Sequence, residues 1–195
     1  ASRLRARRDF KTRERMKAHA SKSPRHATCS VLGRCGGCDQ QDPYDAQLSR
    51  KRAAIRRALE NVVTPEQVEP VRGLSHPFGY RTKLLMPAAP GKVGFGPLLG
   101  FYEKQSTRLV EAIGCPVQHP LTLAAATMVR QVLAGSPVRA SRPKSREGWL
   151  HGIGIRAEPT TGEWELVLCG RTPKVPGEKG LIPRLAALPG VTGIH

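Results

Sequence analysis

The spacing of hydrophobic residues changes from a helical to an extended period near residue 80. Before that point, apolar residues recur at spacings of four, seven, four and three, which places them in one stripe along a helix: Tyr44, Leu48, Ile55, Leu59 and Val62. Asp42 and Pro43 precede the stripe as an N-cap acceptor and a first helical proline. The pattern predicts a helix that begins after Asp42, followed by a linker with a short strand over residues 64–78.

Beyond residue 80 the pattern predicts short strands separated by glycine and proline turns. We expect strands at 82–88, 98–102 and 109–113, then a helix at 121–133 with Gly135 just past its end. A basic loop at 136–148 leads to a hairpin of 149–157 and 163–170, a short helix at 181–188 and a strand at 191–194. The predicted fold class is α+β, a small antiparallel sheet domain with flanking helices. Cys169 falls inside the second hairpin strand, where we expect a small buried hydrophobe.

The net charge of +17, with a pI near 10.6, predicts a polyanionic partner. Clustered Lys and Arg gain affinity for nucleic acid by releasing the counterions of its phosphates. No apolar run approaches the roughly 20 residues that span a bilayer, so we expect no membrane partner. Nucleic acid is the favoured partner.

Residues 1–28 carry a net charge of +8, from ten Lys or Arg against Asp9 and Glu14. With few large apolar residues, this stretch is expected to be disordered when alone. A phosphate-binding arm, an organellar transit segment and a solvated leader are all compatible with the composition. We favour an RNA-binding arm, whose predicted contacts are Arg3, Arg5, Arg7, Arg8, Lys11 and Arg13.

The predicted helix that follows carries a second group of cations. Residues 46–59 contain no Asp or Glu and five cations: Arg50, Lys51, Arg52, Arg56 and Arg57.

Three cysteines within ten residues, in Cys29-x5-Cys35-Gly36-Gly37-Cys38, indicate a soft-metal site. A fourth ligand must come from elsewhere, and Cys115 is the best candidate because a proline follows it directly, as at the end of some iron–sulfur ligand sets. An odd number of cysteines argues against a disulfide framework. Structural zinc remains an alternative, although zinc sites usually use paired short spacings.

The cysteine segment resembles a known family. Cys29-x5-Cys35-Gly36-Gly37-Cys38-x2-Gln41-x2-Tyr44-x2-Gln47-Leu48-x2-Lys51 is similar to the cluster-binding segment of the iron–sulfur RNA uracil-C5 methyltransferases that act on large-subunit (23S) ribosomal RNA. The likeness continues through Phe78-Gly79-Tyr80-Arg81-Thr82-Lys83, Leu99-Gly100-Phe101-Tyr102, Arg108-Leu109-Val110 and Cys115-Pro116-Val117-Gln118-His119-Pro120. It covers roughly residues 29–195.

The resemblance implies a 4Fe-4S cluster held by Cys29, Cys35, Cys38 and Cys115, which staples the cysteine segment to the sheet. It also implies a sheet that grips a single-stranded loop of ribosomal RNA. Arg81, Lys83, Lys104 and Arg108 join the helix residues Arg50, Lys51, Arg56 and Arg57 as predicted RNA contacts. Phe101 or Tyr102 is a candidate stacking surface, with core packing as the alternative.

Family enzymes use S-adenosylmethionine, a nucleophilic cysteine and a catalytic carboxylate, all in a C-terminal domain. Residues 1–195 show no matching glycine-rich turn, so we expect this chain alone to catalyse nothing, unless a further domain or a partner chain supplies the S-adenosylmethionine site. One hypothesis is the RNA-binding region of a ribosomal RNA methyltransferase; the other is a non-catalytic ribosomal RNA-binding component of a ribosome, in contact with ribosomal proteins. The expected location is ribosome-associated, in the bacterial cytoplasm or in a mitochondrion or plastid.

Three segments are therefore predicted. Residues 1–28 form a basic arm, residues 29–63 form the cluster-binding segment and basic helix, and residues 64–195 form a central α+β RNA-binding domain that supplies the fourth cluster ligand.

Overall fold

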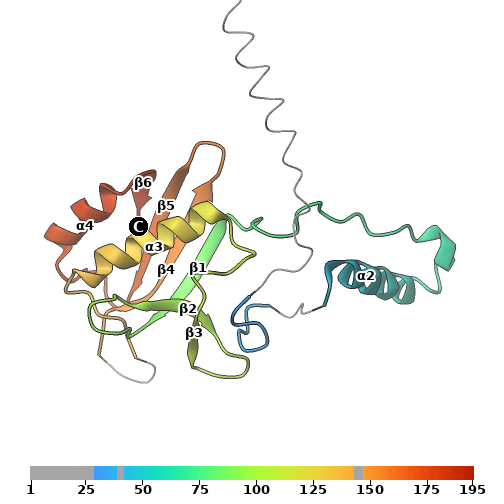
Figure 1. Ribbon diagram of the computed structural model, residues 1–195, viewed down its shortest axis with the longest axis horizontal. Coiled ribbons are helices and arrows are strands. Elements are labelled where there is room, and N and C mark those ends of the chain that lie inside the picture. Colours follow the sequence, from blue (N-terminus) through green and yellow to red (C-terminus); the bar gives the residue numbers. More distant parts are fainter. Residues whose placement is uncertain (1–28, 39–41, 143–146) are drawn as a thin grey trace, which may run out of the picture.

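The computed structural model describes residues 29–38, 42–142 and 147–195 (Figure 1). The predicted basic arm, residues 1–28, lies outside the described residues. The described residues form the following helices and strands in chain order: α2 (Tyr44–Ala58), the short 3₁₀ helix η1 (Pro65–Gln67), β1 (Lys83–Ala89), β2 (Leu98–Tyr102), β3 (Leu109–Glu111), α3 (Pro120–Ala134), β4 (Leu150–Glu158), β5 (Glu163–Gly170), α4 (Glu178–Ala186) and β6 (Val191–Ile194).

The strands form one six-stranded sheet in the order β3-β2-β1-β4-β5-β6. Four neighbouring pairs are antiparallel, but β6 runs parallel to β5. The sheet is therefore mixed, and the prediction of a wholly antiparallel sheet is wrong. The reason is α4, which crosses over between the two strands and returns the chain in the same direction.

One face of the sheet is packed against α3 and α4, which lie on the same side in Figure 1. Side chains that alternate along β1 and β4, such as Leu84, Met86, Ile153 and Ile155, are almost fully buried in this layer. Ala125 and Val129 from α3 and Leu181 and Leu185 from α4 complete the same core. The predicted α+β class is correct, and most expected elements agree with the observed bounds to within a few residues.

The start of helix α3 is set by the two residues His119 and Pro120. Pro120 takes the first helical position, and the ring nitrogen Nδ1 of His119 accepts a hydrogen bond of 3.1 Å from the backbone amide of Leu121. Because proline lacks an amide hydrogen, it removes one of the donors that a helix start leaves unpaired. This start matters for the site described below, because Cys115 lies in the turn just before it.

Helix α2 differs from its prediction. It begins after Pro43 without a side-chain cap, ends at Ala58, and buries none of its residues. The predicted apolar stripe therefore does not pack into a core: Ile55 is 45% exposed and Val62, which lies beyond the helix, is 77% exposed. The spacing was helical, but only the first part of the stripe is covered: Tyr44 and Leu48 are half-buried against the segment around Gly73, and the remainder is exposed.

The segment after α2 holds that helix in place. The backbone amide of Leu74 donates to the Tyr44 hydroxyl at 2.8 Å, and the Arg52 guanidinium donates to the carbonyl of Val68. This segment contains η1 and, among its described residues, no strand, so the predicted short strand is wrong. No helix in the described part of the chain combines the length and the apolar character that crossing a bilayer requires.

Candidate functional site

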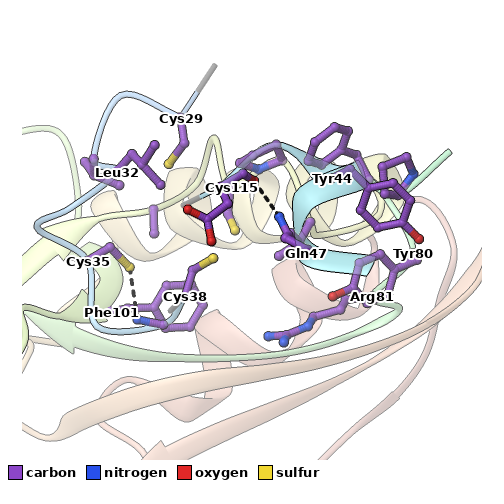
Figure 2. A pocket seen from close by; sticks show the side chains of 18 of the residues that line it. Cys29, Leu32, Cys35, Cys38, Tyr44, Gln47, Tyr80, Arg81, Phe101 and Cys115 are labelled. Atoms are coloured by element: carbon purple, nitrogen blue, oxygen red, sulfur yellow. Dashed lines mark hydrogen bonds between the residues drawn. The ribbon is translucent and has the colours of Figure 1, made fainter. Parts of the chain in front are cut away.

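Four cysteines from two distant parts of the sequence line one pocket of about 600 Å³. Cys29, Cys35 and Cys38 come from the loop before α2, and Cys115 comes from the turn before α3. Figure 2 shows their side chains arranged around the same space. The sequence analysis predicted these four residues as the ligands of one metal centre; they line a common pocket, and their role as ligands stays a prediction. Cys169, in β5, is half-buried rather than buried and is not among the residues that line the pocket.

Backbone hydrogen bonds attach the cysteine loop to the end of β2. The amide of Gly36 donates to the carbonyl of Tyr102 at 2.8 Å, and the amide of Lys104 donates to the carbonyl of Arg34 at 3.3 Å. Cys35 consequently forms an isolated antiparallel bridge with Glu103. A Cβ atom on Gly36 would lie 2.9 Å from the Tyr102 carbonyl oxygen, so a residue without a side chain is needed for this close approach.

Glu103 strengthens the same junction through its side chain. Its carboxylate accepts hydrogen bonds from Arg108 Nε at 2.7 Å and from Arg34 Nη2 at 3.0 Å. Hydrogen bonds from Arg108 first, and from Arg34 second, hold the pKa of Glu103 below its usual range. One carboxylate therefore links the cysteine loop to the turn between β2 and β3.

Cys115 is positioned by a tight turn and by the segment before β1. Its amide donates to the carbonyl of Ala112 at 3.0 Å, while Gly79 and Arg81 donate their amides to the carbonyls of Pro116 and Val117. Burial raises the pKa of the Cys115 thiol, and the neighbouring Cys29 and Cys35 thiols act in the same direction. Backbone amides that point at its sulfur partly oppose this rise. The Cys35 sulfur likewise accepts a hydrogen bond, from the amide of Gly37 at 3.3 Å.

Sharing a pocket is not the same as forming a site for a single ion. Within residues 29–38, 42–142 and 147–195, no three His, Cys, Asp or Glu side chains are grouped so that they could hold one metal ion. The chemistry available in the pocket is therefore that of four thiols around a common space, two of them near backbone amide donors.

The predicted RNA-binding cations lie in several places. Lys51 and Arg81 line the cysteine pocket, and the Arg81 guanidinium lies 5.9 Å from the centre of the Tyr80 ring. Arg50 is paired with Asp42, and Arg108 is paired with Glu103. The remaining described members are exposed (Arg57, Lys83 and Lys104) or half-buried (Arg56). The six predicted arm contacts, from Arg3 to Arg13, lie outside the described residues.

The two candidate stacking residues lie on opposite faces of β2. Phe101 lines the cysteine pocket and packs against the core, whereas Tyr102 is 45% exposed. Core packing is therefore the role of Phe101, and Tyr102 keeps a ring surface open to a ligand.

Sequence reasoning missed the residues that hold the cysteine loop. Arg34 and Glu103 are 69 positions apart, so no local spacing connects them. Asp42, which we expected to cap α2, instead pairs with Arg50. The available signal for Glu103 was its place as the acid in the turn between two strands, with Lys104 and Arg108 as the cations of that turn.

No protein-family model matches the chain. Its homologues include bacterial proteins named uncharacterized RNA methyltransferases. One from Halalkalibacterium halodurans is 32% identical over 172 residues, which is 86% of this chain and 37% of that protein. One from Listeria monocytogenes is 32% identical over 196 residues, covering 96% of this chain and 42% of that protein. One from Gloeobacter violaceus is 36% identical over 176 residues, with 85% and 37% covered. The chain thus spans about two fifths of the length of these relatives.

A solved structure shares the fold. The crystal structure of Pyrococcus abyssi tRNA (uracil-54, C5)-methyltransferase in complex with S-adenosyl-L-homocysteine matches with a TM-score of 0.53 and 22% sequence identity. The match covers 71% of this chain and 32% of that one. At this level of identity, the match establishes the architecture of the sheet and its helices.

Proposed function

We propose that this chain is the RNA-binding region of a protein of the RNA uracil-C5 methyltransferase type, braced by a 4Fe-4S cluster on its four pocket cysteines. The observation that carries the proposal is the convergence of Cys29, Cys35, Cys38 and Cys115 on one pocket with Lys51 and Arg81 among its lining residues. The names of the bacterial relatives and the shared fold support the RNA methyltransferase part.

The donor set suits a cluster better than a zinc ion. The ground for a cluster is the spacing of the cysteines, three within ten residues and a fourth far along the chain, because zinc sites usually use paired short spacings. Amide hydrogen bonds at the Cys35 and Cys115 sulfurs also suit a cluster, because such bonds stabilise charge on its thiolates.

In this proposal the cluster has a structural role. When bound, it would supply iron–thiolate bonds that cross-link the loop before α2 to the turn before α3. The chain's own residues do the remaining work. Glu103 and the Gly36 amide hold the loop on β2, while Lys51 and Arg81 present positive charge beside the pocket to RNA phosphates.

Methyl transfer is assigned to parts of the relatives that this chain does not match. Those parts would supply the S-adenosylmethionine site, the cysteine that adds to the uracil ring and the carboxylate for proton removal. Ribosomal RNA is the proposed substrate, because the cysteine segment resembles that of the enzymes acting on it.

A second candidate function is a non-catalytic ribosomal RNA-binding component of a ribosome. The net charge of +17 in 195 residues favours it, since sequence-independent phosphate binding needs only such charge. The reading frame beyond His195 separates the two. A downstream S-adenosylmethionine-binding domain with a nucleophilic cysteine supports the methyltransferase, whereas an immediate stop codon supports the structural role.

The cluster is tested by metal analysis of protein purified without oxygen. We expect about four iron and four sulfide per chain, with broad visible absorbance. Cys115→Ser should lose this absorbance, whereas the matched variant Cys169→Ser should keep it, because Cys169 is not among the pocket-lining residues. One zinc per chain without iron, or equal loss in both variants, would refute the cluster assignment.

A further inference from the structure

A β-bulge interrupts the pairing of β4 with β5 at His151. Leu150 pairs with Gly170 and Gly152 pairs with Cys169, so β4 contains one extra residue at this point. Leu150 is buried in the core, whereas His151 is exposed. Bulges are frequent beside functional sites, where they redirect a side chain.

A buried hydroxyl holds the His151 ring. Ser141 Oγ lies 2.8 Å from His151 Nδ1, and Ser141 is only 7% exposed. Within the described residues, Nδ1 is the one hydrogen-bond partner of this hydroxyl. Because a buried hydroxyl hydrogen without an acceptor costs free energy, Ser141 donates to Nδ1, and the ring hydrogen lies on Nε2. The exposed His151 ring therefore offers an N–H donor to solvent.

Backbone hydrogen bonds join three segments beside the bulge. The amide of Ser141 donates to the carbonyl of Leu150 at 2.8 Å, and the amide of Arg171 donates to the carbonyl of Trp149 at 2.9 Å. The Trp149 ring is buried, and its Nε1 donates to the carbonyl of Thr172 at 2.9 Å. Trp149 therefore fixes the segment after β5 next to the start of β4.

Exposed cations lie on two of these segments. Arg142 follows Ser141 directly, and Arg171 follows β5 directly, with its Nε donating to the carbonyl of Gly148 at 3.3 Å. Residues 139–157 contain one acid, Glu147, against five Arg or Lys. Guanidinium groups and an imidazole N–H together suit an anion with several oxygen atoms, and arginine pairs with phosphate through two parallel hydrogen bonds.

The bulge is distant from the cysteine pocket. His151 precedes Gly152, whose register partner on β1 is Pro87. The extended chain between Pro87 and Arg81, a residue that lines the pocket, is about 20 Å long. His151, Arg142 and Arg171 are not among the RNA contacts that the sequence predicted, although residues 136–148 were expected to form a basic loop.

We propose that His151, Arg142 and Arg171 bind one phosphate group of an RNA backbone at this bulge. The inference rests on the proposed RNA-binding function and adds to it a contact outside the cysteine pocket and the predicted cations. A contact of this kind positions RNA without reading its bases. Ser141 is a positioning residue, because it acts through the His151 ring. A free phosphate offers the same chemistry, and the probes below distinguish the two sources.

The first test is the salt dependence of RNA binding by the full chain, purified without oxygen. The probe is a fluorescent RNA hairpin, and the variant is Arg142→Gln. Because one cation no longer neutralises a phosphate, the slope of log affinity against log salt should fall by about 1. Arg72→Gln, which removes an exposed cation in the segment after α2, is the matched control and should keep the slope. An equal slope in the parent chain and in Arg142→Gln would overturn the inference.

The second test observes the His151 ring directly. Nitrogen NMR of the imidazole should show the hydrogen on Nε2, and addition of the RNA hairpin should shift the Nε2 resonance. His151→Ala should weaken RNA binding by about 5-fold, which corresponds to the loss of one hydrogen bond. Ser141→Ala keeps every charge but releases the ring, so binding should weaken while the salt slope stays unchanged.

Inorganic phosphate, added alone in a parallel titration, separates the two sources of the anion. A shift of the Nε2 resonance with RNA supports the inference, whereas a shift with phosphate and none with RNA assigns the site to a free phosphate and overturns the RNA contact. RNA binding that none of the three variants changes would overturn this inference alone. Failure of the unsubstituted chain to bind any RNA would overturn the proposed function as well.

Discussion

Glu103 illustrates how a single side chain organises the cysteine site. It is largely shielded, with a side chain only 13% exposed, while its partners Arg34 and Arg108 extend into solvent. Surface ion pairs usually contribute little to stability, but two cations on one carboxylate restrict a loop that has few other contacts. We therefore expect Glu103 to act on the position of the cysteines.

Replacing this carboxylate should loosen the cysteine loop. In Glu103→Gln, hydrogen exchange at residues 30–37 should accelerate, and iron should be lost to a chelator faster, because the loop keeps only its backbone bonds to β2. The matched control is Glu69→Gln, which removes a fully solvated pair with Arg72. Identical exchange in both variants would contradict the proposed role of Glu103.

The same residue predicts a dependence on pH. Because the arginines lower the folded-state pKa of Glu103, its contribution to stability is complete above the ordinary value of 4.5 and is lost as pH falls through the lower folded value. The exchange difference between the parent chain and Glu103→Gln should therefore be constant at neutral pH and shrink in acid. A difference that grew on acidification would contradict this sign.

At the scale of elements, the chain divides into a packed sheet layer and an attached basic helix. The core contains residues of β1 to β6, α3 and α4, and none from α2. Helix α2 is held by hydrogen bonds to the segment after it and by its proximity to the cysteine loop. If the proposed cluster is present, the order of α2 should consequently depend on it far more than the order of the sheet does.

Removal of the proposed cluster should affect α2 and the cysteine loop but not the sheet. After chelation under reducing conditions, hydrogen exchange should rise in residues 29–38 and in α2, while β1, β4 and β5 keep their protection. The sheet retains its protection because its buried layer is independent of the pocket. Cooperative unfolding of the sheet on iron loss would show instead that the cluster supports the whole fold.

At the scale of the whole molecule, positive charge dominates and is concentrated at one end. Residues 1–28 hold +8 of the net +17, which leaves about half of the excess charge on residues 29–195. Association with RNA should therefore combine a strong salt-dependent attraction with contacts made by the folded part.

Deleting residues 1–28 should weaken RNA binding and flatten its salt dependence, while the unfolding transition of the folded part stays unchanged. On a single strand, every phosphate that the arm neutralises adds about 0.7 to the slope, so the decrease in slope measures how many phosphates the arm binds. Fluorescence anisotropy across a salt series gives this slope. An unchanged slope would assign these cations to another role, such as a transit segment.

Local patterns in the sequence were sufficient for most of the fold. The strands predicted at 82–88 and 149–157 agree with β1 and β4 to within one residue, and the alternation of side chains along them places Leu84, Met86, Ile153 and Ile155 on one buried face. Strand alternation depends on neighbouring residues, and the sequence carries it directly. The sulfur chemistry of the cysteines led to the hypothesis of one metal centre, which the pocket brings together from distant segments.

The tertiary structure decided what depends on contacts between distant segments. Packing between distant segments decided three features that the spacing of residues along the chain does not predict. These are the exposure of the α2 stripe, the parallel direction of β6 beside β5, and the choice of Glu103 as the acid that holds the cysteine loop. The register that sets Lys83 opposite Arg156 belongs to the same class. The amino-acid sequence by itself therefore determined most of the helices and strands and named four candidate cysteine ligands, and the folded arrangement determined which side chains are buried and which remain exposed.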